Sequence, residues 1–262
     1  KVRAKQNITK DKTNDKVFGI LIHGDAAMAG QGIVAETFAM SQLRGFRTGG
    51  TIHFVINNQI GFTTTPHYGR SAPYCTEIAK MVQAPIFHVN GDDPEAVVHV
   101  CRLAAEYRNL FKEDVVVDMF CYRRSGHNEA DEPMFTQPLM YKKIKSHSTT
   151  LNLYKEQLVR EEVLTAEEAK SKISDFKIFL DSEFELSKSY KPNKADWLDG
   201  TWTGIKIASI DARRGKTSST EEDIKALAKE IHSIPKDFTP HKRIQKIYNE
   251  RQESINDGKN ID

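Results

Sequence analysis

The sequence predicts an α/β protein with a doubly wound, mainly parallel sheet and a helical C-terminal extension. In the first half, continuous apolar runs alternate with segments of helical spacing, as expected for strands covered on both faces and joined by right-handed crossovers. After residue 137 the strand pattern fades and helical patterns dominate. We therefore divide the 262-residue chain into an α/β domain of residues 1–150 and a helical extension of residues 151–262.

Four strands are expected in the first half, at residues 17–22, 52–56, 86–89 and 114–122, and polar residues 1–15 lead straight into the first. A Gly-rich turn and a helix of about residues 33–44 follow the first strand. A long loop of residues 57–73 and a short helix of residues 74–83 follow the second. The segment Asp92-Asp93-Pro94-Glu95 joins an acidic cap to an early proline, which predicts a helix running to about residue 110.

Three helices are expected in the second half, at residues 137–160, 165–189 and 220–232, with irregular chain at 190–219. Thr165 and Thr220 each stand three residues before an acidic side chain, a spacing typical of helix N-termini. This half is expected to connect the α/β domain to a further domain beyond Asp262.

Composition excludes several classes of function. The net charge of +2 gives no case for binding nucleic acid or a membrane, and no apolar run approaches the length of about 20 residues that spans a bilayer. We expect no signal peptide at the start of the sequence. The three cysteines form no CxxC pair, which argues for free thiols in a reducing compartment. Cys101 and Cys121 lie in apolar runs and are expected in the core.

Polar residues follow two strands at the edge of the sheet where ligands of open α/β folds bind. The first strand ends in His23-Gly24-Asp25-Ala26-Ala27 and the second in Asn57-Asn58-Gln59-Ile60. Asp25 and Asn58 supply the oxygen ligands that Mg²⁺ prefers, and the carbonyl of Ile60 can complete the set. Ala26 and Ala27 are small enough for a diphosphate to approach the backbone.

Each motif taken alone also has a plain structural explanation. A Gly-Asp pair after a strand is often a turn with a helix cap, and Asn-Asn often begins a loop. The segment Gly30-Gln31-Gly32 begins a glycine pattern that a nicotinamide site would use, but Asp25 stands where the pyrophosphate of that cofactor would approach. The pattern GxxxxGK[ST] of P-loop enzymes is absent.

Two longer stretches carry a specific resemblance. HGDAAMAGQGIVAETFAMSQLRGFRTGGTIHFVINNQIGFTT, residues 23–64, and YRRSGHNEADEPMFTQPLMY, residues 122–141, are similar to the decarboxylating components of 2-oxoglutarate dehydrogenases, which depend on thiamine diphosphate. The resemblance implies that Asp25, Asn58 and the Ile60 carbonyl hold Mg²⁺, and that Ala26 and Ala27 lie beside the diphosphate.

The resemblance also places His127 in the active site, on a loop that closes over the diphosphate in related enzymes. For Arg123 and Arg124, ion pairs with Glu129, Asp131 or Glu132 are about as plausible as anion binding. His23, next to the cofactor turn, either lines the site or only hydrogen-bonds the turn, and the first is slightly favoured. His53, inside a strand, is expected to be structural.

The implied activity is oxidative decarboxylation of 2-oxoglutarate in the tricarboxylic acid cycle. Its succinyl group passes to a lipoyl group of a partner succinyltransferase. The family implies a homodimer, located in the cytoplasm of a bacterium or the mitochondrial matrix of a eukaryote. A related acid such as 2-oxoadipate, or an inactive interaction module of the same fold, is the alternative.

The resemblance further implies that this chain supplies only part of an active site. In the family, a separate domain of the other subunit binds the aminopyrimidine end of the cofactor and carries an essential Glu, and substrate-binding histidines precede the region matched here. Neither is found in the sequence. We therefore expect a fragment that carries the Mg²⁺-diphosphate half of the site and is inactive by itself.

Overall fold

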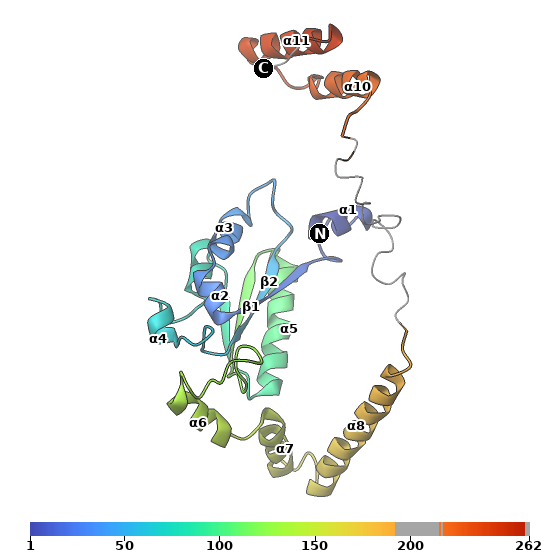
Figure 1. Ribbon diagram of the computed structural model, residues 1–262. Helices are drawn as coiled ribbons and strands as arrows, with labels where there is room; N and C mark the ends of the chain where they lie inside the picture. Colours follow the sequence, from blue (N-terminus) through green and yellow to red (C-terminus); the bar gives the residue numbers. More distant parts are fainter. Residues whose placement is uncertain (192–214, 216, 260–262) are drawn as a thin grey trace. The chain divides into compact units, whose positions relative to one another are not determined.

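The structure is a computed structural model that describes residues 1–191, 215 and 217–259. The chain divides into two compact units, Lys1–Lys188 and Ser189–Asp262. Figure 1 shows the sheet and its covering helices in the first unit and two helices in the second. The expected boundary at residue 150 falls inside the first unit, so a domain division there stays a prediction.

A four-stranded parallel sheet forms the centre of the first unit. Its strands are β1 (Gly19–Gly24), β2 (Thr51–Asn57), β3 (Ile86–Asn90) and β4 (Val115–Phe120), arranged in the order β1-β2-β4-β3. Gly24 pairs with Ile56, and Asn57 and Asn90 both pair with Phe120, so the strands end at one common edge. The expected doubly wound parallel sheet is confirmed.

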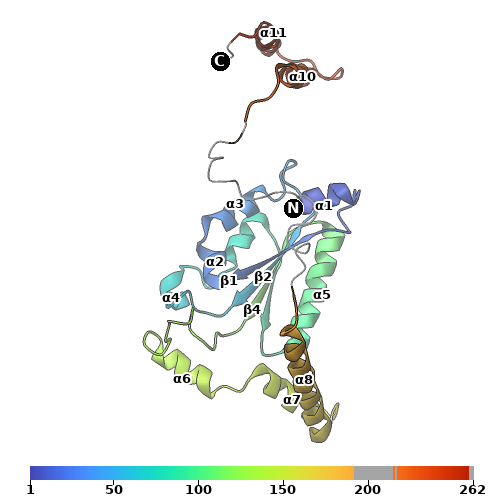
Figure 2. The ribbon, with the colours of Figure 1, turned by 45° about the vertical axis from the view of Figure 1, so that its right-hand side comes forward.

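Helices cover both faces of the sheet at β2, β3 and β4, whereas most of the edge strand β1 is exposed, in contrast to the expected coverage of its apolar run. Figures 1 and 2 place α2 (Asp25–Gly30) and α3 (Gly32–Met40) on one face and α5 (Pro94–Phe111) on the other. The 3₁₀ helix η1 (Glu77–Val82) packs with α3. Successive residues of a strand point to opposite faces. Accordingly Val116 packs under α2 and α3 with Met28, while Val117 packs under α5 with Ala104.

The α5 helix begins as the sequence predicts. Asp93 accepts a hydrogen bond from the backbone N–H of Ala96 at 2.9 Å, and Pro94 occupies the first turn. An N-cap acceptor and an early proline both suit a helix start, because the first amides have no partner inside the helix. The helix ends at Phe111, one residue beyond the predicted end.

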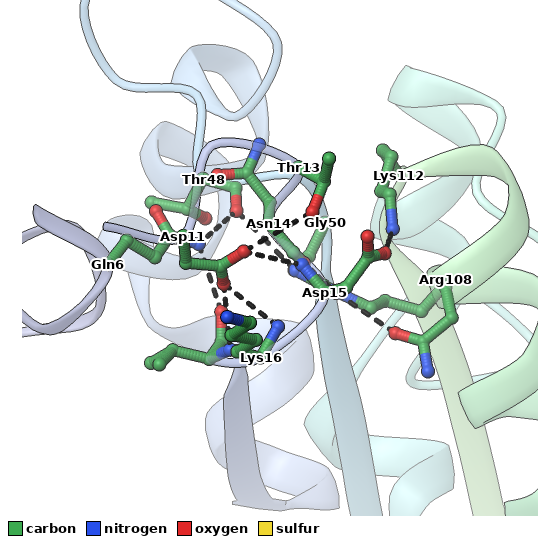
Figure 3. A network of polar contacts seen from close by, with 12 residues as sticks. Gln6, Asp11, Thr13, Asn14, Asp15, Lys16, Thr48, Gly50, Arg108 and Lys112 are labelled. Atoms are coloured by element: carbon green, nitrogen blue, oxygen red, sulfur yellow. Dashed lines mark hydrogen bonds and ion pairs between the residues drawn. The ribbon is translucent and has the colours of Figure 1, made fainter. Parts of the chain in front are cut away.

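The N-terminal segment is folded, in contrast to the expected direct lead into a strand. Residues Val2–Ile8 form α1, and the buried side chain of Gln6 donates to the carbonyls of Val17 and Thr48 at 2.9 and 2.8 Å. Asp11 accepts the N–H groups of Lys16 and Val17. Figure 3 shows how these bonds join the segment to the amino end of the sheet.

Arg108 is the largest fully buried side chain of the described residues and belongs to the same network. From α5 it donates to the carbonyl of Gly50 at 3.1 Å and to that of Asn14 at 2.5 Å. Gly50 has φ +84°, and a Cβ there would lie 2.2 Å from the Glu113 carbonyl oxygen. Only glycine fits this approach without a backbone shift.

The remaining described helices are α4 (Pro66–Gly69), α6 (Pro138–Ser146), α7 (Thr150–Arg160), α8 (Ala166–Ser187), α10 (Glu221–Ile231) and α11 (Lys242–Asn256). Thr165 forms the predicted capping box with Glu168, and Thr220 caps α10. The single helix expected at 137–160 is wrong: His147 has an extended backbone and Thr149 caps a new helix. Helix α11 was not expected, and most of residues 190–219 lie outside the described residues.

The cysteines differ from the expectation. All three are free, but Cys75 is the buried one, while Cys101 and Cys121 are half-buried. Burial and then the charge of Asp118 raise the pKa of the Cys75 thiol to about 12. The apolar runs around Cys101 and Cys121 therefore overstated their burial.

In the described part of the chain no helix is long and apolar enough to cross a membrane.

Candidate functional site

Asp25 and Asn58 leave two neighbouring parallel strands at the same edge of the sheet. Asp25 follows the end of β1 directly and is the first residue of α2, and it is buried. Asn58 follows the end of β2. Because Gly24 pairs with Ile56, the two chain segments turn out of the sheet side by side. The sequence missed α2, where it predicted only a Gly-rich turn.

The two successive asparagines have different roles. Asn57 is fully buried, and its Nδ2 donates to Oδ1 of Asp118 on β4 at 3.0 Å. Asn58 is half-buried, and its Oδ1 accepts only a long bond of 3.3 Å from the Ile60 N–H. Because successive side chains of a strand point in opposite directions, Asn57 points into the protein and Asn58 points away from it at the start of the loop. Among the described residues the Oδ1 atom of Asn57 has no hydrogen-bond partner, but it is buried, so the half-buried Asn58 is the asparagine whose amide oxygen is more open to a ligand.

The loop after β2 approaches the start of α2 closely. A Cβ on Gly61 would lie 2.8 Å from the Cβ of Ala26. Gly61 and Thr64 exchange backbone hydrogen bonds of 2.8 Å, which holds the loop in a tight turn. Ala26 is exposed and Ala27 half-buried, so small side chains line the outer surface of α2 at this point. Ile60 is buried, with Tyr141 and Ile144 of α6 in its cluster.

Arg70 is a site residue that the sequence did not reveal. Its Nη1 lies 3.0 Å from Oδ2 of Asp25, and the two side chains are only 10% and 3% exposed. Both belong to the lining of a cavity of about 190 Å³, together with Ala26, Gly61 and Thr64. The sequence separation of 45 between the partners explains why no local spacing pointed to the pair.

These residues fit a hard cation with a diphosphate. The donor set is one buried carboxylate, one amide oxygen and one backbone carbonyl, which suits Mg²⁺ when the phosphates and waters fill the remaining positions. Within the described residues, no group of three or more His, Cys, Asp or Glu side chains is arranged to hold a metal.

His23 contacts another histidine. Its Nε2 lies 3.0 Å from Nδ1 of His53, and the rings stack with centroids 5.3 Å apart. His53 also packs against Phe38 of α3. Burial, and then the neighbouring His23, lower the pKa of His53 to about 4, and burial lowers the pKa of His23. This contact suits the structural role expected for His53, while a role of His23 toward a ligand stays a prediction.

His127 lies on the loop after β4 and against the loop after β2. Its ring meets Phe62 edge-on, with centroids 4.7 Å apart, and its backbone N–H donates to Asp131. Arg123 donates to the Phe62 carbonyl at 2.7 Å. The structure thus joins the two loops that carry His127 and Asn58.

The ion pairs considered for Arg123 and Arg124 are not formed. Arg123 donates to the carbonyls of Phe62 and Ser125. Arg124 donates to the Tyr122 hydroxyl and the His147 carbonyl, and it lies over the Tyr122 ring. Three backbone carbonyls and one hydroxyl, not the nearby carboxylates, therefore accept the hydrogen bonds of these two arginines.

A buried polar group beneath the site was also missed. Asp118 of β4 is fully buried, and its Oδ2 lies 2.9 Å from Nδ1 of His88 on β3. Its Oδ1 accepts from Asn57. Asp118 thereby bridges three adjacent strands just below their carboxyl ends. Its place in an apolar strand run was the available signal, since a buried carboxylate needs partners.

The fold and the strand-edge site define a class: a doubly wound α/β protein with an oxygen-donor site at the carboxyl ends of its strands. The family model described as dehydrogenase E1 component matches residues 3–196, and the chain belongs to that family. It is 50% identical over 273 aligned positions to proteins named 2-oxoglutarate dehydrogenase E1 component from Brucella canis, Brucella suis and Brucella abortus. The alignments cover 100% of this chain and 27% of each relative, so the chain spans about a quarter of their length.

Proposed function

We propose that this chain provides the Mg²⁺-diphosphate half of the thiamine-diphosphate site in a 2-oxoglutarate dehydrogenase E1 component. The observation that best supports the proposal is the buried carboxylate of Asp25, placed beside Asn58 at the carboxyl edge of a parallel sheet. Identity of 50% to relatives that bear that name supports the substrate.

In this proposal Asp25, Asn58 and the Ile60 carbonyl bind Mg²⁺, and Ala26 and Ala27 lie beside the diphosphate. When bound, the cofactor supplies the electron sink that makes loss of CO₂ from a 2-oxo acid possible. The protein residues bind and orient it. His127, tied to the Phe62 loop, lines the site from the second loop, and His23 lines it from the end of β1.

The proposal extends to the assembly. The chain works as part of a homodimer, whose other subunit supplies the aminopyrimidine end of the site. The succinyl group passes to a lipoyl group on a partner succinyltransferase. The proposed compartment is the cytoplasm of a bacterium or the mitochondrial matrix of a eukaryote.

Turnover by the full-length protein tests this function. With Mg²⁺, thiamine diphosphate and an artificial electron acceptor, 2-oxoglutarate should be consumed much faster than 2-oxoadipate at equal concentration. Omission of thiamine diphosphate is the control and should abolish turnover. Preference for 2-oxoadipate would change the substrate assignment, and turnover that does not need the cofactor would overturn the proposal.

A further inference from the structure

We propose that Arg70 is a positioning residue for the cation site, which it serves by holding the Asp25 carboxylate in the orientation that leaves Oδ1 for Mg²⁺. This inference rests on the proposed function, because it assumes that Asp25 binds the cation. It assigns a role to Arg70, a residue that was not proposed for the site from the sequence.

The geometry of the pair is the first support. Nη1 of Arg70 contacts Oδ2 of Asp25 at 3.0 Å. Among the described residues, Oδ1 of Asp25 takes part in no hydrogen bond. One oxygen is therefore held while the other remains available. A carboxylate held by one oxygen has lost most of its rotational freedom before the cation arrives, so less entropy is lost on binding.

The chemistry of the partner is the second support. A guanidinium stays charged at all relevant pH values and presents donors in a rigid, planar arrangement. A carboxylate removed from water needs a charged or hydrogen-bonding partner, and the guanidinium supplies both. With 10% and 3% exposure, the two side chains are shielded from water that would otherwise weaken the pair.

The position of Arg70 in the chain is the third support. It immediately follows α4, in the loop that starts with Asn58 and Ile60. The loop thus contacts the α2 segment at two points, through Gly61 against Ala26 and through Arg70 on Asp25. The ion pair links the element that carries one proposed ligand to the loop that carries the other two.

The test uses the full-length protein and measures Mg²⁺ binding at a fixed concentration of thiamine diphosphate by calorimetry. Arg70→Met should raise the Mg²⁺ dissociation constant by about 10-fold or more, the range seen when groups that orient metal ligands are removed. Arg70→Lys retains the charge but not the planar donors and should fall between wild type and Arg70→Met. Arg102→Met, at an exposed position of α5, is the matched control and should leave binding unchanged.

The other outcomes separate this inference from the function on which it rests. Tighter Mg²⁺ binding in Arg70→Met would mean that Arg70 competes with the cation, and would overturn the inference. So would a lower melting temperature with unchanged Mg²⁺ affinity, which is the result of a purely structural ion pair. If wild type itself failed to bind Mg²⁺ with the cofactor, the proposed function would fail, and the inference with it.

Discussion

Asn57 and Asp118 meet through a 3.0 Å hydrogen bond between the ends of two neighbouring strands, where both side chains are fully buried. Asp118 also engages His88, so one carboxylate joins β2, β3 and β4. Asn57 precedes the proposed cation ligand Asn58. The side chain that joins these strands is two residues from the end of β4.

Replacement of that carboxylate should destabilise the sheet. Asp118→Ala removes the acceptor of the buried Asn57, and an unpaired buried polar group costs about 1–3 kcal/mol. The exposed His88 can pair with water instead, so we expect the free energy of unfolding of the chain, measured in urea, to fall by about 2 kcal/mol. Asp181→Ala, at an exposed position of α8, is the control and should change it by less than about 0.5 kcal/mol. Equal stability of the two variants would refute the bridging role.

The buried His53 should make stability depend on pH. Its pKa falls from the ordinary 6.5 to about 4 in the folded chain. The unfolded chain therefore binds the proton more readily, so stability is full above pH 6.5 and is lost as the pH falls toward 4. The difference between the two pKa values of His53 corresponds to a loss of roughly 3 kcal/mol in the free energy of unfolding once the pH has fallen below about 4.

Hydrogen exchange of β1 and β2, corrected for the intrinsic pH dependence of exchange, measures this effect. The opening free energy should decrease between pH 7.5 and 5 in wild type. In His53→Gln it should decrease distinctly less, and the exposed His99→Gln should behave like wild type. A slope that survives in His53→Gln would assign the pH dependence to other groups.

The loops of residues 57–73 and 122–136 should be mobile without cofactor and should become ordered together. Arg123 donates to the carbonyl of Phe62, which couples the loops, and Gln137, directly after the second loop, donates to the carbonyl of Thr63. Hydrogen exchange of the full-length protein should show both loops gaining protection with Mg²⁺ and thiamine diphosphate. Arg123→Met should weaken the joint response. Strong, equal protection in both states would count against the prediction.

Much of the fold follows from local pattern, and particular residues show why. The apolar runs of β2 and β4 and the cap at Asp93 are contained in short segments, so the sequence predicts them well. Helix α2 was missed because its six residues, DAAMAG, are too few for a helical period and begin where a turn is expected. The break at His147 was missed because the residues around it are polar, and polar residues occur both on exposed helices and in the loops that join helices.

Candidate site residues could be proposed from the sequence only where they follow strands. Asp25 and Asn58 were proposed from their positions after two apolar runs, and the sheet brings those two strand ends to one edge. Arg70 and Asp118 were not proposed from the sequence. Arg70 is 45 residues from its partner Asp25, and Asp118 is 61 residues from its partner Asn57. Contacts over such separations are set by tertiary packing, which no local pattern records.

The 262-residue chain by itself should show no measurable decarboxylation. It is expected to hold one end of the cofactor, and correct placement of reacting groups can account for roughly 7–11 kcal/mol of a barrier. The isolated chain, mixed with 2-oxoglutarate, Mg²⁺, thiamine diphosphate and an artificial electron acceptor, should leave the acceptor oxidised. The full-length protein is the positive control. Cofactor-dependent reduction by the isolated chain would mean that it contains a complete site.

The most direct test of the Mg²⁺-diphosphate site is calorimetric titration of thiamine diphosphate, in the presence of Mg²⁺, into the full-length protein and its Asp25→Ala variant. Loss of the only carboxylate in the proposed ligand set should abolish detectable Mg²⁺-dependent binding, while Asp175→Ala, at an exposed position of α8, should bind like wild type. Near-normal affinity in Asp25→Ala would contradict the account, because the cation would then be held elsewhere.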